Sequence, residues 1–126
     1  MPTILIADDS MFQRFQIART ATQAGYDVIE ARDGQECLRL VVEKRPDVLL
    51  LDLNMPVLDG LTVLERLGAD KVMPAWVFVI TADIQDTTRK RCLDLGARDC
   101  LNKPVDPTVL EHWLAEAGAR LGRRGV

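Results

Sequence analysis

Five short apolar runs alternate with helical patterns along this chain of 126 residues, and this alternation restricts the fold more than any other feature. The clearest runs are Ile4–Ala7, Val48–Leu51 and Trp76–Ile80. Runs of this length without interspersed polar residues are typical of parallel strands that are buried on both faces. Five strand–helix units therefore predict an α/β fold, a doubly wound sheet of five parallel strands.

The order of the strands follows from the handedness of their connections. Right-handed crossovers leave few arrangements, and 2-1-3-4-5 is the common order for a five-stranded doubly wound sheet. The predicted domain spans residues 1–121, and residues 122–126, rich in Gly and Arg, are expected to form a frayed tail. We expect strands at about residues 4–7, 28–29, 47–51, 76–80 and 98–101.

The helical segments carry start and stop signals. Gly25 is expected to end the first helix. Asp83 can cap the fourth helix, and Asp106 followed by Pro107 predicts the start of the fifth. Fraying of the last helix is expected from Gly118 onward. One face of the first helix is predicted to be lined by Met11, Phe15, Ala18 and Ala21.

The composition is that of an ordinary soluble domain, with 48% hydrophobic and 28% charged residues. A net charge of −3 argues against a nucleic-acid partner, and no apolar stretch approaches the ~20 residues of a membrane span. Cys37, Cys92 and Cys100 lack a C-x-x-C spacing, which favours reduced thiols over disulfides or a zinc site. We therefore expect a cytoplasmic protein that binds neither nucleic acid nor membrane.

Polar side chains stand where four of the expected strands end. Asp8 and Asp9 follow the first strand, Asp52 the third, Thr81 the fourth and Lys103 the fifth. Ligands bind outside the carboxyl ends of such strands. Neighbouring strands are ~4.8 Å apart, so carboxylates from strands one and three can reach one cation. A long lysine stem can close much of the ~10 Å between strands three and five.

Three clustered carboxylates repel one another and call for a counter-charge. Mg²⁺ prefers oxygen ligands, and with Lys103 it would bring the formal charge of the site to zero. Asp52 is then the candidate nucleophile for a phosphoryl group, giving an acyl phosphate. Asp9, with Asp8 behind it, would hold the metal, while Lys103 and the Thr81 hydroxyl would stabilise the phosphoryl oxygens.

Each of these residues alone has an ordinary structural explanation. Asp9 with Ser10 could be a helix N-cap, and Asp52 could accept hydrogen bonds from loop amides. Thr81 is a common type of residue at a strand end, and most lysines are solvated. The occurrence of all four groups at successive strand ends favours a functional site.

These residues resemble the receiver domain of two-component response regulators, which has the CheY-like fold, and the resemblance covers essentially the whole chain. The matching motifs are Asp8-Asp9-Ser10, Asp52-Leu53-Asn54-Met55-Pro56 with Asp59-Gly60, Thr81-Ala82 and Lys103-Pro104. The resemblance implies that a phosphohistidine of a sensor histidine kinase or a phosphotransfer protein phosphorylates Asp52. It implies that Asp9, Asp52 and the Asn54 carbonyl hold Mg²⁺, with Asp8 acting through water. It also implies phosphoryl contacts from the backbone of Asn54 and Ala82 and a cis bond before Pro104.

One position departs from the family pattern. The family often carries Tyr or Phe three residues before the lysine, and this chain has Cys100 there. The usual inward swing of an aromatic ring cannot operate, so we expect the switch to run from Thr81 through the backbone and the fourth helix. Cys100 would be a small strand residue within that switch.

The resulting hypothesis is a stand-alone response regulator that assists its own phosphorylation and dephosphorylation. Its phosphorylated face, formed by the fourth helix, fifth strand and fifth helix, would bind an unknown downstream protein. A receiver fragment of a hybrid kinase or multidomain regulator remains an alternative. An aspartate-nucleophile phosphatase would require a second Asp where Asn54 stands, and an FMN phosphate would be repelled by Asp8 and Asp9.

Overall fold

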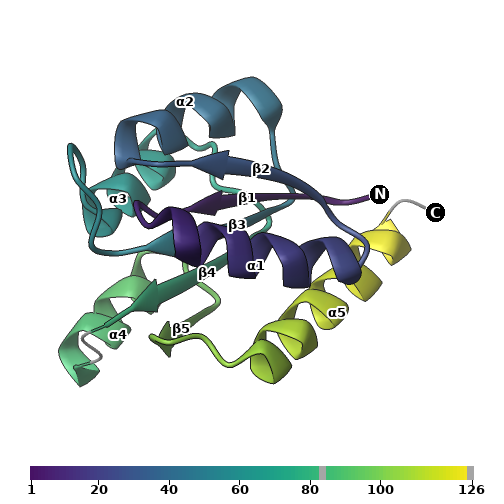
Figure 1. Cartoon of the computed structure of the whole chain (residues 1–126). Coiled ribbons are helices and arrows are strands. Elements are labelled where there is room, and N and C mark those ends of the chain that lie inside the picture. Colours follow the sequence, from purple (N-terminus) through teal and green to yellow (C-terminus); the bar gives the residue numbers. More distant parts are fainter. Residues whose placement is uncertain (83–84, 125–126) are drawn as a thin grey trace.

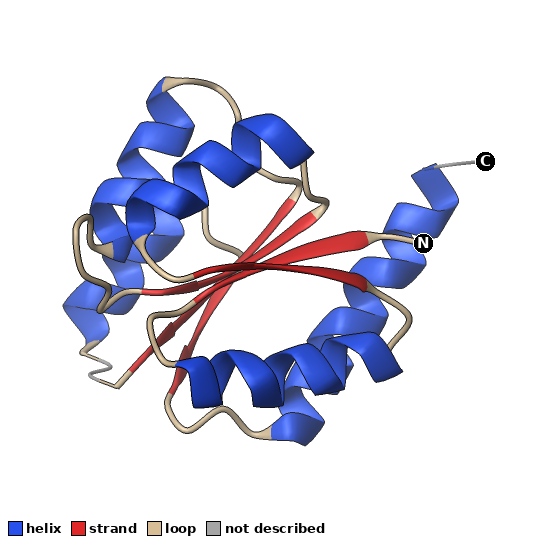
Figure 2. Ribbon diagram, turned by 45° about the horizontal axis from the view of Figure 1, so that its top comes forward, coloured by secondary structure: helices blue, strands red, loops and turns tan. Residues whose placement is uncertain are grey.

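Five parallel strands form one sheet in the order β2-β1-β3-β4-β5, with helices on both faces (Figures 1 and 2). This computed structural model describes residues 1–82 and 85–124. The strands are β1 (Thr3–Ala7), β2 (Asp27–Ala31), β3 (Val48–Asp52), β4 (Trp76–Thr81) and β5 (Asp99–Asn102). The helices are α1 (Met11–Gln23), α2 (Gly34–Lys44), α3 (Gly60–Ala69), α4 (Asp86–Asp94) and α5 (Pro107–Arg124). The predicted fold class and strand order are confirmed.

The sheet lies between two layers of helices, as Figure 2 shows, and a cluster of buried hydrophobic side chains fills each side. Side chains of β3 alternate between them: Leu49 and Leu51 pack under α2, α3 and α4, while Val48 and Leu50 pack against α1 and α5. Because both faces are covered, the central strands are buried throughout, which explains their continuous apolar sequence. Among the described residues, no helix has both the length and the apolar character needed to cross a membrane.

Helix α1 turns a different face to the sheet from the one that the sequence predicts. Ala21 is buried as expected, and Ala18 packs partly against the core. Met11 and Phe15, however, are 75% and 66% exposed. The buried residues of α1 are Arg14, Ile17 and Ala21.

The orientation of α1 has a polar cause. Arg14 Nε donates a hydrogen bond to Glu30 on β2 at 3.1 Å, and its Nη1 donates to the Asp8 carbonyl oxygen at 2.6 Å. Both bonds require Arg14 to face the sheet. The stripe that contains Arg14 and Ile17 is offset by one residue, about 100°, from the predicted stripe. Large apolar side chains are therefore left in solvent.

The ends of three helices test the predicted capping residues. Gly25 follows α1 with a φ of 92°, a left-handed conformation that suits glycine and ends the helix as predicted. Asp106 also acts as predicted, since its Oδ1 accepts a hydrogen bond from the Thr108 N–H at 2.8 Å. The predicted cap Asp83 lies outside the described residues, and α4 begins at Asp86 with Gln85 at its N-cap.

Helix α5 extends past the point where the sequence predicts fraying. The helix continues through Gly118 to Arg124, so the expectation of fraying from Gly118 is wrong. Packing explains the continuation. Tyr26 donates a buried hydrogen bond to the Leu114 carbonyl at 2.6 Å, and Leu121 packs partly against the same core. The separate expectation that residues 122–126 form a frayed tail outside the domain stays a prediction.

Gly60 provides a test of how tightly α3 packs on the third strand. A Cβ atom at Gly60 would lie 2.7 Å from the Asp52 carbonyl oxygen, whereas one at Gly68 would meet only Met73, at 3.9 Å. We expect Gly60→Ala to lower the free energy of unfolding by about 1–3 kcal/mol. The control Gly68→Ala should raise it by roughly 0.5–1 kcal/mol through helix propensity. Urea unfolding measures both, and equal effects of the two changes would contradict the packing argument.

Candidate functional site

The register of the sheet aligns the carboxyl ends of four strands. The residues paired at these ends are Ala7 with Leu51, Asp52 with Ile80, and Thr81 with Asn102. Polar side chains that follow these positions therefore come to one edge of the sheet. The structure places Asp8, Asp52, Thr81 and Lys103 there, as the sequence predicts.

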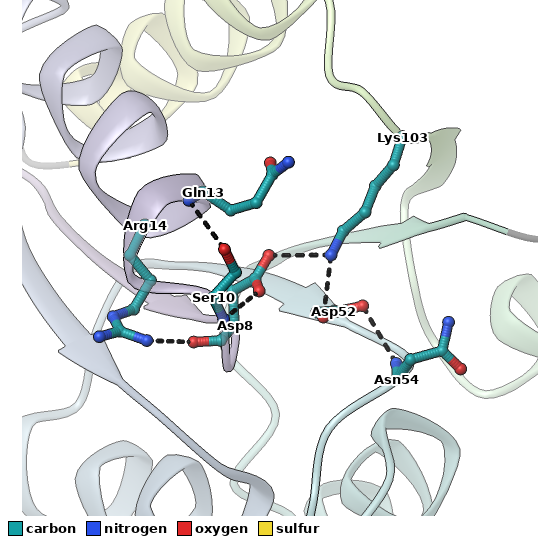
Figure 3. Close-up of polar contacts among 7 residues, drawn as sticks. All are labelled: Asp8, Ser10, Gln13, Arg14, Asp52, Asn54 and Lys103. Carbon is teal, nitrogen blue, oxygen red and sulfur yellow. Dashed lines mark hydrogen bonds and ion pairs between the residues drawn. The ribbon is translucent and has the colours of Figure 1, made fainter.

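Asp52 is the last residue of β3 and is almost fully buried, with 1% of its surface exposed. Its Oδ1 accepts a hydrogen bond from the Asn54 N–H at 3.0 Å, and its Oδ2 accepts one from Lys103 Nζ at 3.0 Å. Figure 3 shows the lysine reaching from its own strand end toward the two buried carboxylates. The predicted span between strands three and five is thus closed by a direct contact.

Asp8 is buried completely beside Asp52. Its Oδ1 accepts a hydrogen bond from the Ser10 N–H at 2.9 Å. Its Oδ2 lies 3.1 Å from Lys103 Nζ, close enough for an ion pair, but no hydrogen bond reaches this oxygen from any described residue. A buried oxygen with unused lone pairs faces the site.

The pKa shifts of Asp52 and Lys103 show which charge of the site is unfavourable. Burial raises the pKa of Asp52, and the neighbouring Asp8 raises it further, although the Asn54 N–H and Lys103 act in the opposite direction. Burial alone would lower the pKa of Lys103, but Asp52 and Asp8 together outweigh it and raise that pKa. The Asp52 carboxylate, not the Lys103 ammonium, therefore carries the unfavourable charge.

A divalent cation fits this set of donors. One oxygen each from Asp8, Asp9 and Asp52 can be chosen so that all three lie within 4.8 Å of one another. Asp9 is exposed while the other two are buried, so the cluster opens to solvent on one side. Carboxylate oxygens are ligands that Mg²⁺ prefers, and the Asp8 Oδ2 atom has bonding capacity to spare.

The remaining predicted residues surround this cluster. Thr81 is buried at the end of β4, and its carbonyl accepts a hydrogen bond from the Lys103 N–H at 2.8 Å. Ala82 and Asn54 are exposed beside the site. The metal contact predicted for the Asn54 carbonyl and the phosphoryl contact predicted for Ala82 stay predictions. The cis bond predicted between Lys103 and Pro104 is present.

Cys100 lies below the site in the middle of β5, where it pairs with Val79. It is buried and belongs to the same hydrophobic cluster as Cys92 on α4. Burial raises the pKa of the Cys100 thiol and raises that of Cys92 to about 11. Cys100 is thus a buried residue between the sheet and α4, and its part in switching stays a prediction.

Arg14 is a residue at this site that the sequence prediction missed. Its guanidinium holds the carbonyl of Asp8, as described above. The available signal was spacing, because Arg14 precedes Ile17 and Ala21 by three and seven residues and so shares their helix face. An arginine is rarely assigned to an inward face, since charged groups are seldom buried without a partner.

The raised pKa of Asp52 has a consequence for stability. Because the pKa of Asp52 is raised in the folded state, the ionised side chain lowers the stability of the fold. This loss of stability is complete at pH values above the raised pKa, and it disappears as the pH falls toward the ordinary pKa of about 3.9. We expect Asp52→Asn to raise the urea midpoint in metal-free buffer at about pH 8, with a gain that shrinks toward pH 4. Asp59→Asn is the control, because Asp59 is an exposed helix cap and Asn caps equally well. A gain that grows with acidity would contradict the argument.

Comparison with known proteins identifies relatives of this chain. A family model for the response regulator receiver domain matches residues 4–115. The transcriptional regulatory protein PrrA of Mycobacterium bovis is 39% identical over 125 residues, which are 98% of this chain and 52% of that protein. Response regulator MprA of Mycobacterium tuberculosis is 40% identical over 121 residues, 95% of this chain and 50% of that protein. The chain therefore spans about half the length of these relatives.

Solved structures agree with the sequence relatives. The receiver domain of the Francisella response regulator 1452 has a TM-score of 0.89 at 28% identity, covering 96% of this chain and 99% of that one. The chemotaxis protein CheY4 of Vibrio cholerae has a TM-score of 0.85 at 29% identity, covering 93% of this chain and 98% of that one. The acidic cluster, the strand-end lysine and these matches together show that the chain belongs to the response regulator receiver domain family, with the CheY-like fold.

Proposed function

We propose that this chain is a phosphoacceptor of a two-component phosphorelay and that Asp52 receives the phosphoryl group. The observation that carries the proposal is the placement of Lys103 Nζ, 3.0 Å from Asp52 and 3.1 Å from Asp8, at the carboxyl edge of the sheet. Lys103 offsets part of the negative charge that an anionic phosphoryl group would meet at Asp52, and a bound divalent cation would offset the rest. The donor would be a phosphohistidine of a sensor histidine kinase or a phosphotransfer protein.

The transfer is a displacement at phosphorus. A carboxylate oxygen of Asp52 forms the new O–P bond as the N–P bond of phosphohistidine breaks, and the leaving imidazole nitrogen takes a proton. Lys103 and the Thr81 hydroxyl would stabilise the phosphoryl oxygens, and the Ala82 backbone would contact them. Asp9, Asp52 and the Asn54 carbonyl would hold Mg²⁺, with Asp8 acting through water. When bound, Mg²⁺ would neutralise charge on the transferring group.

Small phosphodonors test the assignment of Asp52 directly. With acetyl phosphate and Mg²⁺, intact mass spectrometry should show one added phosphoryl group on the wild type and none on Asp52→Asn. Asp59→Asn is the matched control, because it removes another carboxylate, one whose side chain caps α3. This variant should be labelled like the wild type, since Asp59 is not the proposed phosphoacceptor. Labelling of Asp52→Asn to the same extent as the wild type would refute the assignment.

A protein donor would need a docking surface beside Asp52, and α1 offers one. Met11, Phe12 and Phe15 are 75%, 67% and 66% exposed, and we call them the α1 patch. A groove of about 260 Å³ borders it and is lined by Phe12 and Phe15 from α1 and by Val105 and Pro107 from the chain after Lys103. The groove beside the α1 patch therefore lies between the helix that follows the acidic pair and the chain that follows Lys103. We assign it to the phosphodonor protein.

The α1 patch can be separated from the chemistry by changing the donor. Phe15→Ser should slow transfer from the most active phosphorylated kinase of the source organism by roughly tenfold or more, as truncation of an anchoring aromatic does at other interfaces. Its labelling by acetyl phosphate should equal that of the wild type, because this donor needs no docking surface. Val42→Ser is the control, since Val42 is an apolar residue 54% exposed on α2.

Two outcomes would contradict the role of the α1 patch. If Phe15→Ser lowers labelling by both donors equally, the substitution acts on the site itself. If kinase transfer is unchanged, the donor docks elsewhere. The kinase used in this test would be chosen beforehand as the one that transfers its phosphoryl group fastest to the wild type.

The phosphorylated form is proposed to bind a protein target through the face formed by α4, β5 and α5. Arg89 and Lys90 are exposed on α4. Arg89 Nη2 lies 2.9 Å from Asp99 Oδ1 on β5, and exposed pairs of this kind contribute only about 0–1 kcal/mol. Such a weak tie would let α4 shift when Thr81 turns toward a phosphoryl group. Cys100, beneath α4, would belong to the same switch.

One observation supports a second form of this function. The matched relatives are about twice as long as this chain, and PrrA is named a transcriptional regulatory protein. The same receiver could therefore serve within a longer regulator. In either form we propose a cytoplasmic signalling protein, not a metabolic enzyme, whose own residues assist phosphorylation and dephosphorylation.

A further inference from the structure

Arg14 stands out among the buried side chains. The described residues include four buried polar or charged ones, namely Asp8, Arg14, Asp52 and Thr81. Three of them supply the carboxylates and the hydroxyl group of the site already described. The fourth, Arg14, is only 7% exposed and comes from α1. Burying a guanidinium is costly without partners, so its contacts indicate what it does.

The contacts of Arg14 converge on the backbone beside the acidic pair. Its Nη1 donates a buried hydrogen bond of 2.6 Å to the carbonyl oxygen of Asp8, and its Nε donates to Glu30 Oε1 at 3.1 Å. The N–H of Asp8 donates in turn to the Ala31 carbonyl at 3.1 Å. Both peptide groups that flank Asp8 are therefore held, one by the Ala31 carbonyl of β2 and one by Arg14, whose bond to Asp8 is drawn in Figure 3.

An arginine suits this place better than a lysine. Its planar guanidinium offers several N–H groups at fixed angles, so one side chain can hold the Asp8 carbonyl and Glu30 together. Glu30 supplies the counter-charge and sets the plane of the guanidinium. A lysine ammonium would keep the charge but lose this fixed geometry.

The carbonyl that Arg14 holds belongs to the Asp8–Asp9 peptide. The orientation of that peptide directs the bond from Asp9 Cα to its side chain. Asp9 is exposed, and in the described part of the chain no hydrogen bond fixes its carboxylate. The backbone therefore sets the direction of the Asp9 Cα–Cβ bond, and with it the region that the carboxylate can reach beside Asp8 and Asp52.

We propose that Arg14, oriented by Glu30, is a positioning residue that fixes the Asp8–Asp9 peptide so that Asp9 offers its carboxylate to a divalent cation. The inference rests on the cation site of the proposed function. It adds a helix residue and a β2 residue that touch neither the cation nor the phosphoryl group.

Magnesium affinity tests the role of Arg14 without any phosphoryl donor. We expect Arg14→Gln to weaken Mg²⁺ binding by about tenfold, the lower end of what loss of a ligand-orienting contact costs. Titration followed by NMR amide shifts measures it. Arg14→Lys should recover part of the affinity. Glu30→Gln should weaken binding to a smaller extent, and because Glu30 is half-exposed this variant tests the proposal even if Arg14→Gln does not fold.

A matched control separates positioning from general stability. Ile17→Val shortens the next buried side chain of the same helix face, so it should lower the urea midpoint while leaving Mg²⁺ affinity unchanged. Wild-type affinity in Arg14→Gln, or in Glu30→Gln where Arg14→Gln does not fold, would overturn the inference. A loss of affinity in Ile17→Val that matches its loss of stability would do the same. If the wild type itself bound no Mg²⁺, the proposed function would fail instead.

Discussion

The ammonium group of Lys103 is the charge on which the carboxyl edge of the sheet depends. Two buried carboxylates, Asp8 and Asp52, lie 3.1 and 3.0 Å from its Nζ atom. Without it, two like charges would stand side by side out of water, where one would take up a proton. The lysine comes from the end of β5, which is separated from β3 by β4. The same ion pairs therefore tie the outer strand to the centre of the sheet. One ammonium cannot neutralise three carboxylates, which leaves the site suited to a divalent cation.

Most of this site could be predicted because the carboxyl ends of parallel strands lie at one edge of the sheet. Each candidate residue stands at the end of an apolar run, so all of them were expected at that edge. The sequence could not show which of two adjacent aspartates is buried. Asp8 lies inside and Asp9 outside, because the chain turns after β1 along a path set by contacts from other elements. Those contacts, from Ala31 and Arg14, come from residues that carry no motif of their own.

The errors of prediction arose where tertiary contacts overrule a local pattern. Helix α1 contains two stripes of helical spacing, and the more apolar one, with Met11 and Phe15, lies in solvent. Hydrophobicity alone selects the wrong stripe, because a partly buried ion pair to Glu30 and a buried bond to a backbone carbonyl fix the rotation of the helix. At the other end of the chain, glycines suggest a fraying helix, yet packing carries α5 to Arg124. In both places the deciding partner lies far away in the sequence.

Cys100 shows how a change of residue type alters the physical route of a signal. A large ring at this position could report on the site by moving between a buried and an exposed place. A small thiol that is already buried in the cluster it shares with Cys92 has no such movement to make. Nor is it poised for oxidation, because burial raises the pKa of both thiols and so suppresses the reactive thiolate. Cys92 lies on α4 and Cys100 on β5, so the pair joins these elements directly. In the proposed switch, a signal that passes from Thr81 to this face would therefore move α4 against β5, at the contact between the two cysteines.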